Sequence, residues 1–163
     1  MKHTISILVE NHAGVLARVA GLFARRGFNI DSLAVGVTED EKISRITIIA
    51  DGTAYTLEQI EKQLNKLIDV IKVRHLPAEE LLSRELVLIK VVCQPSQRAE
   101  LISLAEIAKA KISDITVNTM TLELSDSVPR IKTFEELLRP YGIKETVRTG
   151  SIAMQKGGAS MKL

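Results

Sequence analysis

Apolar side chains in the first part of the chain follow two different periods. In residues 4–9, Ile5, Ile7 and Val9 alternate with Thr4, Ser6 and Leu8, a two-residue period that is typical of a strand with one face on a core. From Gly14 the apolar spacing becomes that of an amphipathic helix, and Gly27 is a residue type that often ends helices. The pattern predicts a strand followed by a helix. The apolar positions are Ile5, Ile7 and Val9 in the strand and Val15, Val19, Leu22 and Phe23 in the helix.

The next residues predict a hairpin, a second helix and a last strand. Alternation over residues 33–37 and again over 46–48, separated by a polar turn, indicates the hairpin. Thr56 followed by Gln59 matches a capping box, so the second helix is predicted to begin at Thr56. Alternation over residues 71–74 predicts the last strand. The order of elements is βαββαβ.

The same order repeats in the second half of the chain. Residues 77–84 contain Pro77 and interrupt the pattern, as a linker or a single helical turn would. Beyond them lie candidate strands at 86–93, 112–117, 120–124 and 143–154, with helices after Pro95 and around 131–138. We therefore predict an α+β fold of two tandem ferredoxin-like βαββαβ units, each a four-stranded antiparallel sheet with two helices on one face. The predicted boundaries are 1–76 for the first unit, 77–84 for the linker and 85–163 for the second unit.

The other face of the first predicted sheet carries fewer charges than a solvated face usually does. Its residues include Thr4, Ser6, Leu8, Ala34 and Thr47. Pairing with a second copy of the chain, either face to face or through edge strands, is one way to cover it.

Charge and aromatic content argue against nucleic acid as a partner. Lys and Arg number 22 against 20 Asp and Glu, which leaves a formal net charge of +2 and no strong basic field. RNA-recognition domains share the βαββαβ order but stack bases on sheet aromatics, and this chain is 3% aromatic without tryptophan.

The N-terminal residues do not match a signal peptide, and the most apolar stretch, residues 86–93, is interrupted by Lys90 and too short to cross a bilayer. The chain has one cysteine, in agreement with a reducing compartment. We therefore expect a cytoplasmic protein without a membrane segment.

Candidate catalytic groups are scattered along the sequence. His3, His12, His75 and Cys93 lack metal-ligand spacing, and no glycine-rich phosphate loop or serine nucleophile elbow is present. We therefore expect no catalytic residues and no metal site.

The stretch ENHAGVLARV is the best candidate for a ligand-binding element. The unpaired amides of Gly14, Val15 and Leu16 at the start of the first helix could receive a carboxylate, with Asn11 beside them. Ordinary turn and capping chemistry explains the same residues equally well. The stretch GFNID at 27–31 has the same two interpretations, ligand binding or local structure, because a helix stop followed by a turn also accounts for it.

Longer segments of the sequence resemble one protein family. They are LVENHAGVLARVAGLFARRGFNIDSLAVG, ISRITI, EQIEKQLNKLIDVIKV, SRELVLIKV and RPYGIKETVRTGSIAM. Together they are similar to the regulatory small subunit of acetolactate synthase, also called acetohydroxyacid synthase, whose N-terminal part is an ACT domain. The resemblance covers essentially the whole chain.

This resemblance implies a regulatory subunit without catalysis of its own. Its partner would be a catalytic large subunit that holds thiamine diphosphate, magnesium and FAD and acts in branched-chain amino acid biosynthesis. The small subunit would activate that enzyme and confer feedback inhibition by valine or a related amino acid, and its second unit would communicate with the large subunit. The alternative is a free-standing ACT-type amino-acid sensor that regulates another metabolic enzyme.

The resemblance also implies a homodimer that binds its effector between two ACT domains. Asn11, Gly14, Val15 and Leu16 would come from one chain, and Asn29 and Ile30 from the other. The helix-end amides would bind the carboxylate, Asn29 and nearby carbonyls the ammonium, and Val15, Leu16 and Ile30 the branched side chain.

Overall fold

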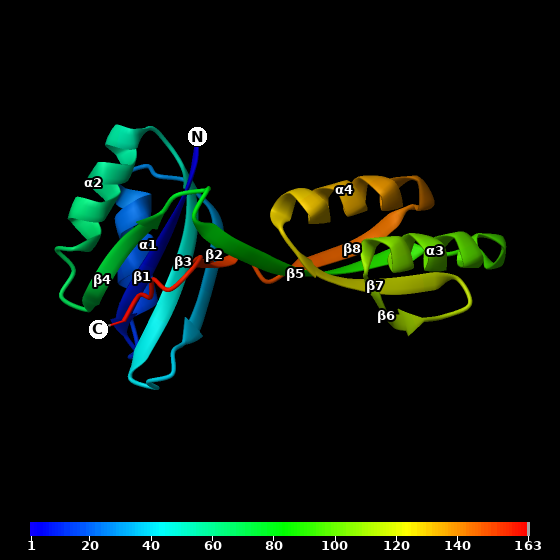
Figure 1. The fold of residues 1–163 in the computed structure, drawn as a ribbon, viewed down its shortest axis with the longest axis horizontal. Helices are drawn as coiled ribbons and strands as arrows, with labels where there is room; N and C mark the ends of the chain where they lie inside the picture. The colour runs from blue at the N-terminus through cyan, green and yellow to red at the C-terminus, as the bar shows by residue number, and fades with distance from the viewer. Residues whose placement is uncertain (163) are drawn as a thin grey trace. The chain divides into compact units, whose positions relative to one another are not determined.

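The computed structural model describes residues 1–162, which divide into two compact units (Figure 1). The N-terminal unit contains Met1–Leu82 together with the chain from Ser151 onward, and the C-terminal unit contains Ser83–Gly150. This division differs from the predicted boundaries, which assign residues 151–163 to the second unit. The physical reason is that the last residues bond to the first sheet.

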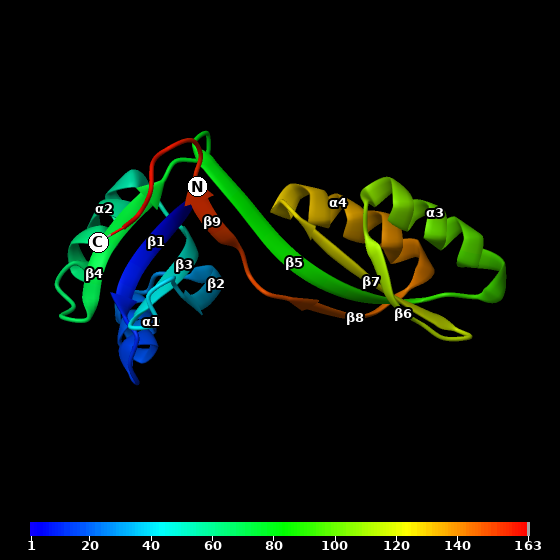
Figure 2. The same cartoon turned by 60° about the horizontal axis from the view of Figure 1, so that its bottom comes forward.

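The N-terminal unit has the predicted βαββαβ order. Its sheet is antiparallel with strand order β2-β3-β1-β4. Both helices lie on the same side of it (Figures 1 and 2). The tandem ferredoxin-like fold predicted from the sequence is thereby confirmed for this half. The elements are β1 (Lys2–Glu10), α1 (Val15–Arg25), β2 (Ile30–Val37), β3 (Ile43–Asp51), α2 (Ala54–Leu64) and β4 (Val70–Leu76).

The core between this sheet and its helices contains the apolar residues that the strand and helix periodicities predicted to be buried. Alternate side chains of β1 point toward the helices, and one apolar stripe of α1 packs against these side chains. Burial of this apolar surface is the main force that holds the layers together. The buried members from β1 and α1 are Ile5, Ile7, Val9, Val15, Val19, Leu22 and Phe23.

Glycines lie at both ends of α1, where the backbone adopts left-handed angles. Gly14 precedes the helix with φ +89°, and Gly27 follows it with φ +68°. After Gly27, the amide of Phe28 donates to the carbonyl of Phe23 at 3.0 Å, which closes the helix end. A side chain with a Cβ atom is strained at these angles, so glycine fits both positions.

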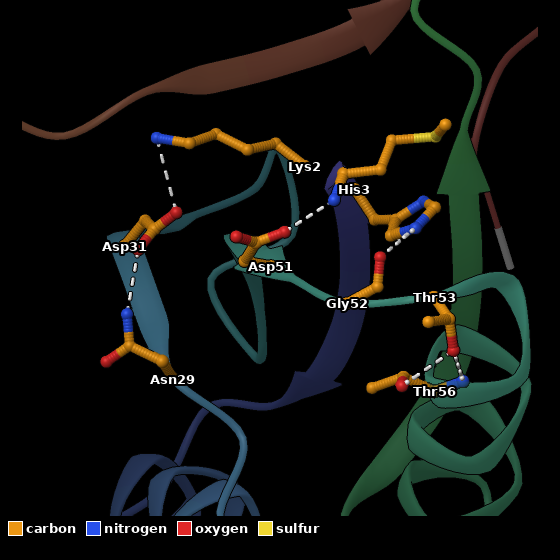
Figure 3. Close-up of polar contacts among 9 residues, drawn as sticks. Lys2, His3, Asn29, Asp31, Asp51, Gly52, Thr53 and Thr56 are labelled. Carbon is orange, nitrogen blue, oxygen red and sulfur yellow. Dashed lines mark hydrogen bonds and ion pairs between the residues drawn. The ribbon is translucent and has the colours of Figure 1, made fainter.

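The predicted start of α2 at Thr56 is wrong. The helix begins at Ala54, and the N-cap is Thr53, whose hydroxyl accepts a hydrogen bond from the Thr56 amide at 3.2 Å (Figure 3). Thr53 has an extended backbone, which is what an N-cap requires, whereas Thr56 already lies in the first helical turn.

The C-terminal segment, residues 151–162 with strand β9 (Ile152–Gln155), covers the sheet face opposite the helices. The Arg45 guanidinium donates to the Ala153 carbonyl at 2.8 Å, and the Ser151 amide donates to the Ser32 hydroxyl at 2.9 Å. Ser6 and Thr47 on this face are buried. A second copy packed face to face is therefore not needed here, because the chain itself supplies the cover.

The C-terminal unit repeats the βαββαβ order. Its strands follow the order β6-β7-β5-β8, with β9 also pairing β5, and α3 and α4 lie on one side of this sheet (Figure 2). The predicted extended segment 143–154 is divided into β8 and β9 at Gly150, which has φ +81°. The elements are β5 (Leu81–Val92), α3 (Arg98–Ala108), β6 (Lys111–Ile115), β7 (Thr119–Asp126), α4 (Val128–Leu138) and β8 (Ile143–Arg148).

Among residues 1–162, no helix is both long enough and apolar enough to cross a lipid bilayer.

Candidate functional site

The first candidate element is the loop that joins β1 to α1. Gly14 is the N-cap of α1, and no side chain caps the helix there. The amides of the first turn therefore point out of the helix without a side-chain acceptor. The partial positive charge of the helix end favours an anion at this place.

Asn11 fixes this loop to the β2–β3 turn. Its backbone amide donates to the Lys42 carbonyl and its side-chain amide to the Glu41 carbonyl, both at 2.7 Å. The side-chain NH2 group carries two donors and uses one of them here, so its second N–H and the side-chain oxygen are left for a ligand. Asn11 therefore has a structural role whether or not a ligand binds.

Val15 and Leu16, the first two residues of α1, differ in burial. Val15 is 3% exposed and packs in the core, so only its backbone amide can reach a ligand. Leu16 is 43% exposed and presents its side chain to the outside. The predicted apolar contact of Val15 with a ligand side chain therefore has no support in this geometry.

An ion-pair network that the sequence did not reveal surrounds the same loop. Asp69 lies just before β4, and its carboxylate is 3.0 Å from His12 Nε2 and 2.7 Å from Arg18 Nε. The Arg18 contact is an ion pair whose N–H does not point at the oxygen. Glu10 Oε2 lies 3.2 Å from His12 Nε2. No local sequence pattern links residue 69 to residues 10–18, because only the fold brings them together.

The environment of His12 favours its protonated form. The ring donates from Nδ1 to the Ala13 carbonyl at 3.2 Å, while Nε2 faces two carboxylates. The Ala13 hydrogen bond raises the pKa of His12 above its ordinary value, and the charges of Asp69 and Glu10 add to this against partial desolvation. Acceptors face both nitrogens, so only the imidazolium can donate on both sides.

The second candidate element is the start of β2. Asn29 is exposed, and its side-chain nitrogen donates to Asp31 Oδ1 at 2.8 Å (Figure 3). Asp31 also forms an ion pair with Lys2 at 3.3 Å. Ile30 is half-buried beside the core. Asn29 thus has a fixed side chain whose carboxamide oxygen is turned away from Asp31.

The two candidate elements lie at opposite ends of the sheet in one chain. Glu10 pairs with Ile43 at one end of β3, whereas Ile30 pairs with Ala50 near the other end. The 11 residues of α1 connect the two ends, a length of about 16 Å. One chain therefore does not assemble Asn11–Leu16 with Asn29 and Ile30.

β2 is an edge strand of the sheet. Within the described part of the chain it pairs only with β3, so its outer backbone groups are unpaired. Val35 and Val37 near its end are 46% and 62% exposed. An edge with exposed apolar side chains is suited to pairing with another strand.

The N-terminal unit has the ferredoxin-like βαββαβ fold expected of a regulatory ACT domain. A family model described as the AHAS small subunit-like ACT domain matches residues 5–72, and one for the small subunit of acetolactate synthase matches residues 84–157. The chain belongs to the acetolactate synthase small-subunit family. It is therefore a regulatory rather than a catalytic subunit, and the resemblance seen in the sequence is confirmed.

Individual members of the family are similar to this chain over nearly its whole length. A protein named probable acetolactate synthase small subunit from Archaeoglobus fulgidus is 50% identical over 157 residues, 96% of this chain and 98% of its own length. The acetolactate synthase small subunit of Mycobacterium leprae is 44% identical over 95% of this chain and 92% of its own. The crystal structure of the small subunit from Thermotoga maritima superposes with a TM-score of 0.91 at 38% identity, covering 98% of this chain and 99% of that one.

Proposed function

We propose that this chain binds the catalytic large subunit of acetolactate synthase in the cytoplasm, activates it, and confers feedback inhibition by valine or a related branched-chain amino acid. The large subunit would hold thiamine diphosphate, magnesium and FAD. Family membership supports the partnership. The observation that carries the effector proposal is the separation of two complementary half-sites within one ACT unit beside an unpaired edge strand.

Two copies joined through β2 would reunite these half-sites. If both copies keep their helices on the same face, the two-fold axis is perpendicular to the sheet and the two β2 strands run antiparallel. The start of β2 in one copy then lies opposite the end of β2 in the other. That end is next to the turn that holds Asn11, because the Asn11 amide donates to Lys42. Asn29 and Ile30 of the second copy would thus approach Asn11–Leu16 of the first.

The chemistry of the reunited site suits an α-amino acid. The amides of Gly14, Val15 and Leu16 would bind the carboxylate, and the Asn29 oxygen with nearby carbonyls the ammonium. Leu16 and Ile30 would contact an aliphatic side chain, which favours a branched one by apolar burial. Val15 contributes its amide alone.

Feedback requires that the effector distinguish two states of the dimer. We propose that the dimer without effector supports the active arrangement of the large subunit, and that valine bound between the copies changes their relative placement. The effector must bind these two states with different affinity, since equal affinity shifts no equilibrium.

The test combines binding with assembly. The purified chain is titrated with each standard amino acid by calorimetry, and its mass in solution is measured with and without the ligand that binds. The chain is then mixed with an acetolactate synthase large subunit, and synthase activity is followed as valine is added. Copurification with activation and valine inhibition is the expected result. Amino-acid binding without any effect on the large subunit would instead favour a sensor for another enzyme.

A further inference from the structure

We propose that Asp69 is a positioning residue for the effector half-site at the start of α1, and that it acts by holding Arg18 and His12 on either side of Gly14. The inference rests on the proposed function, because it concerns how the chain shapes the place where the effector carboxylate would bind. It adds three side chains to a carboxylate position otherwise built from the backbone amides of Gly14, Val15 and Leu16.

Asp69 is almost completely enclosed, with 5% of its surface exposed. A buried carboxylate is costly unless cations or donors compensate it. Both nearby cationic groups come from the loop and the first turns of α1, since His12 lies at 3.0 Å and Arg18 at 2.7 Å. The Asp69 carbonyl also accepts a hydrogen bond from the Glu10 amide at 2.9 Å. Asp69 therefore connects to the chain before and after Gly14.

Arg18 reaches back over the helix end. Side chains lean toward the N-terminus of their helix, and Arg18 Nη2 lies 3.8 Å from where a Cβ atom on Gly14 would be. The ion pair to Asp69 is made through Nε, so the terminal amino groups of the guanidinium remain available, with Nη2 close to Gly14. A guanidinium in that position can donate to a carboxylate through two N–H groups. Without Asp69, this exposed side chain would be free to turn away.

His12 sets the charge of the same loop. When it is protonated, the two cationic groups, His12 and Arg18, balance the carboxylates of Glu10 and Asp69. When it is neutral, the network carries one net negative charge next to the proposed carboxylate position. Glu10 from β1, Asp69 before β4 and Arg18 from α1 are the charged groups that face it. Effector affinity is therefore expected to fall as His12 loses its proton.

The experiment measures valine binding to the full chain by calorimetry from about pH 6 to about pH 8, where histidine titrates. For the unmodified protein we expect affinity to weaken by about three- to tenfold over this range, which corresponds to the uptake of about a quarter to a half of a proton on binding. Asp69→Asn should weaken binding by about ten- to a hundredfold at the lower pH, as loss of a charge-assisted contact does, and flatten the pH profile. His12→Gln should flatten the profile as well.

Asp126→Asn provides a matched control in the C-terminal unit. Asp126 Oδ2 lies 2.8 Å from Arg130 Nε, the same kind of pair as Asp69 with Arg18. Its replacement should leave both the affinity and its pH profile unchanged. Thermal melting of each variant shows which ones are folded at the binding temperature.

Three outcomes would overturn the inference. If folded Asp69→Asn binds valine with the original affinity and pH profile, Asp69 serves stability alone. If Asp69→Asn fails to fold, His12→Gln and Arg18→Gln carry the test, and unchanged affinity and profile in both would be decisive. If the unmodified protein binds no branched-chain amino acid at all, the proposed function itself falls, and the inference falls with it.

Discussion

Replacing Gly14 with aspartate should remove effector inhibition while leaving activation of the large subunit in place. The new carboxylate would occupy the helix end that is proposed to receive the carboxylate of the ligand. Loss of charge-assisted hydrogen bonds there costs about 1.5–3 kcal/mol of binding free energy, or about a 10- to 150-fold higher dissociation constant.

The cost of this change to folding should be small. Gly14 has φ +89°, where an L-residue costs about 1–2 kcal/mol and aspartate is among the better tolerated residues. The nearest side-chain atom to a new Cβ is Arg18 Nη2 at 3.8 Å, so the Cβ atom itself meets no clash. The protein should therefore remain folded, with a modestly lower melting temperature.

The assay is valine inhibition of the assembled synthase, with direct titration of the isolated chain beside it. Gly14→Ala carries the backbone strain without the charge, and Gly157→Asp carries the same substitution at φ +75° with open space around it. Valine should inhibit the Gly157→Asp enzyme normally. Gly14→Ala should lose less of its valine inhibition than Gly14→Asp does. An assembled Gly14→Asp enzyme with an unchanged valine response would refute the assignment of the carboxylate to this helix end.

Other substitutions test separate parts of the structure. Because the pKa of His12 is raised, its contribution to stability is complete below its ordinary value of 6.5 and is lost as pH rises through the raised value; thermal melts across pH should show this for the unmodified chain and not for His12→Gln. Asn29→Ala alters an exposed side chain, so stability should change by about 0.5 kcal/mol or less while calorimetry shows weaker valine binding; unchanged binding would argue against the two-chain site. Arg45→Met removes the bond to Ala153 and should lower unfolding free energy by about 1–3 kcal/mol in denaturant titrations, with no loss meaning that this contact does not hold the C-terminal segment. Thr53→Ala removes the α2 cap and should cost about 1 kcal/mol in the same titration, whereas Thr56→Ala should cost less if Thr53 is the cap.

Truncation of the chain has to take the C-terminal segment into account. A cut after Ser83 removes the second unit, but it also removes the residues that bond to Arg45 and Ser32. Loss of function in such a fragment would therefore not by itself assign a role to the C-terminal unit. Point substitutions within residues 84–148 test that role without exposing the first sheet.

Periodicity along the sequence was enough to predict both βαββαβ units. Each strand and helix has its own repeat of apolar residues, and a repeat depends only on which side of the element each residue faces. Gly14 and Gly27 could likewise be placed at helix ends, because their need for left-handed angles is a local property. The start of α2 could not be predicted from the sequence in this way. Thr53 and Thr56 carry the same side chain and differ only in the backbone angles that the fold imposes.

Tertiary structure decided the features that depend on residues far apart in the chain. Asp69 has no sequence signal that directs it toward His12 and Arg18, and the last residues have none that returns them to β3 of the first sheet. The helix start at Asn11–Leu16 was a candidate from local pattern, and family resemblance joined it to Asn29 and Ile30. The separation of the two elements to opposite ends of the sheet follows from strand register. Such contacts depend on which strands and turns become neighbours, and that is settled by the packing of the whole unit rather than by any local pattern.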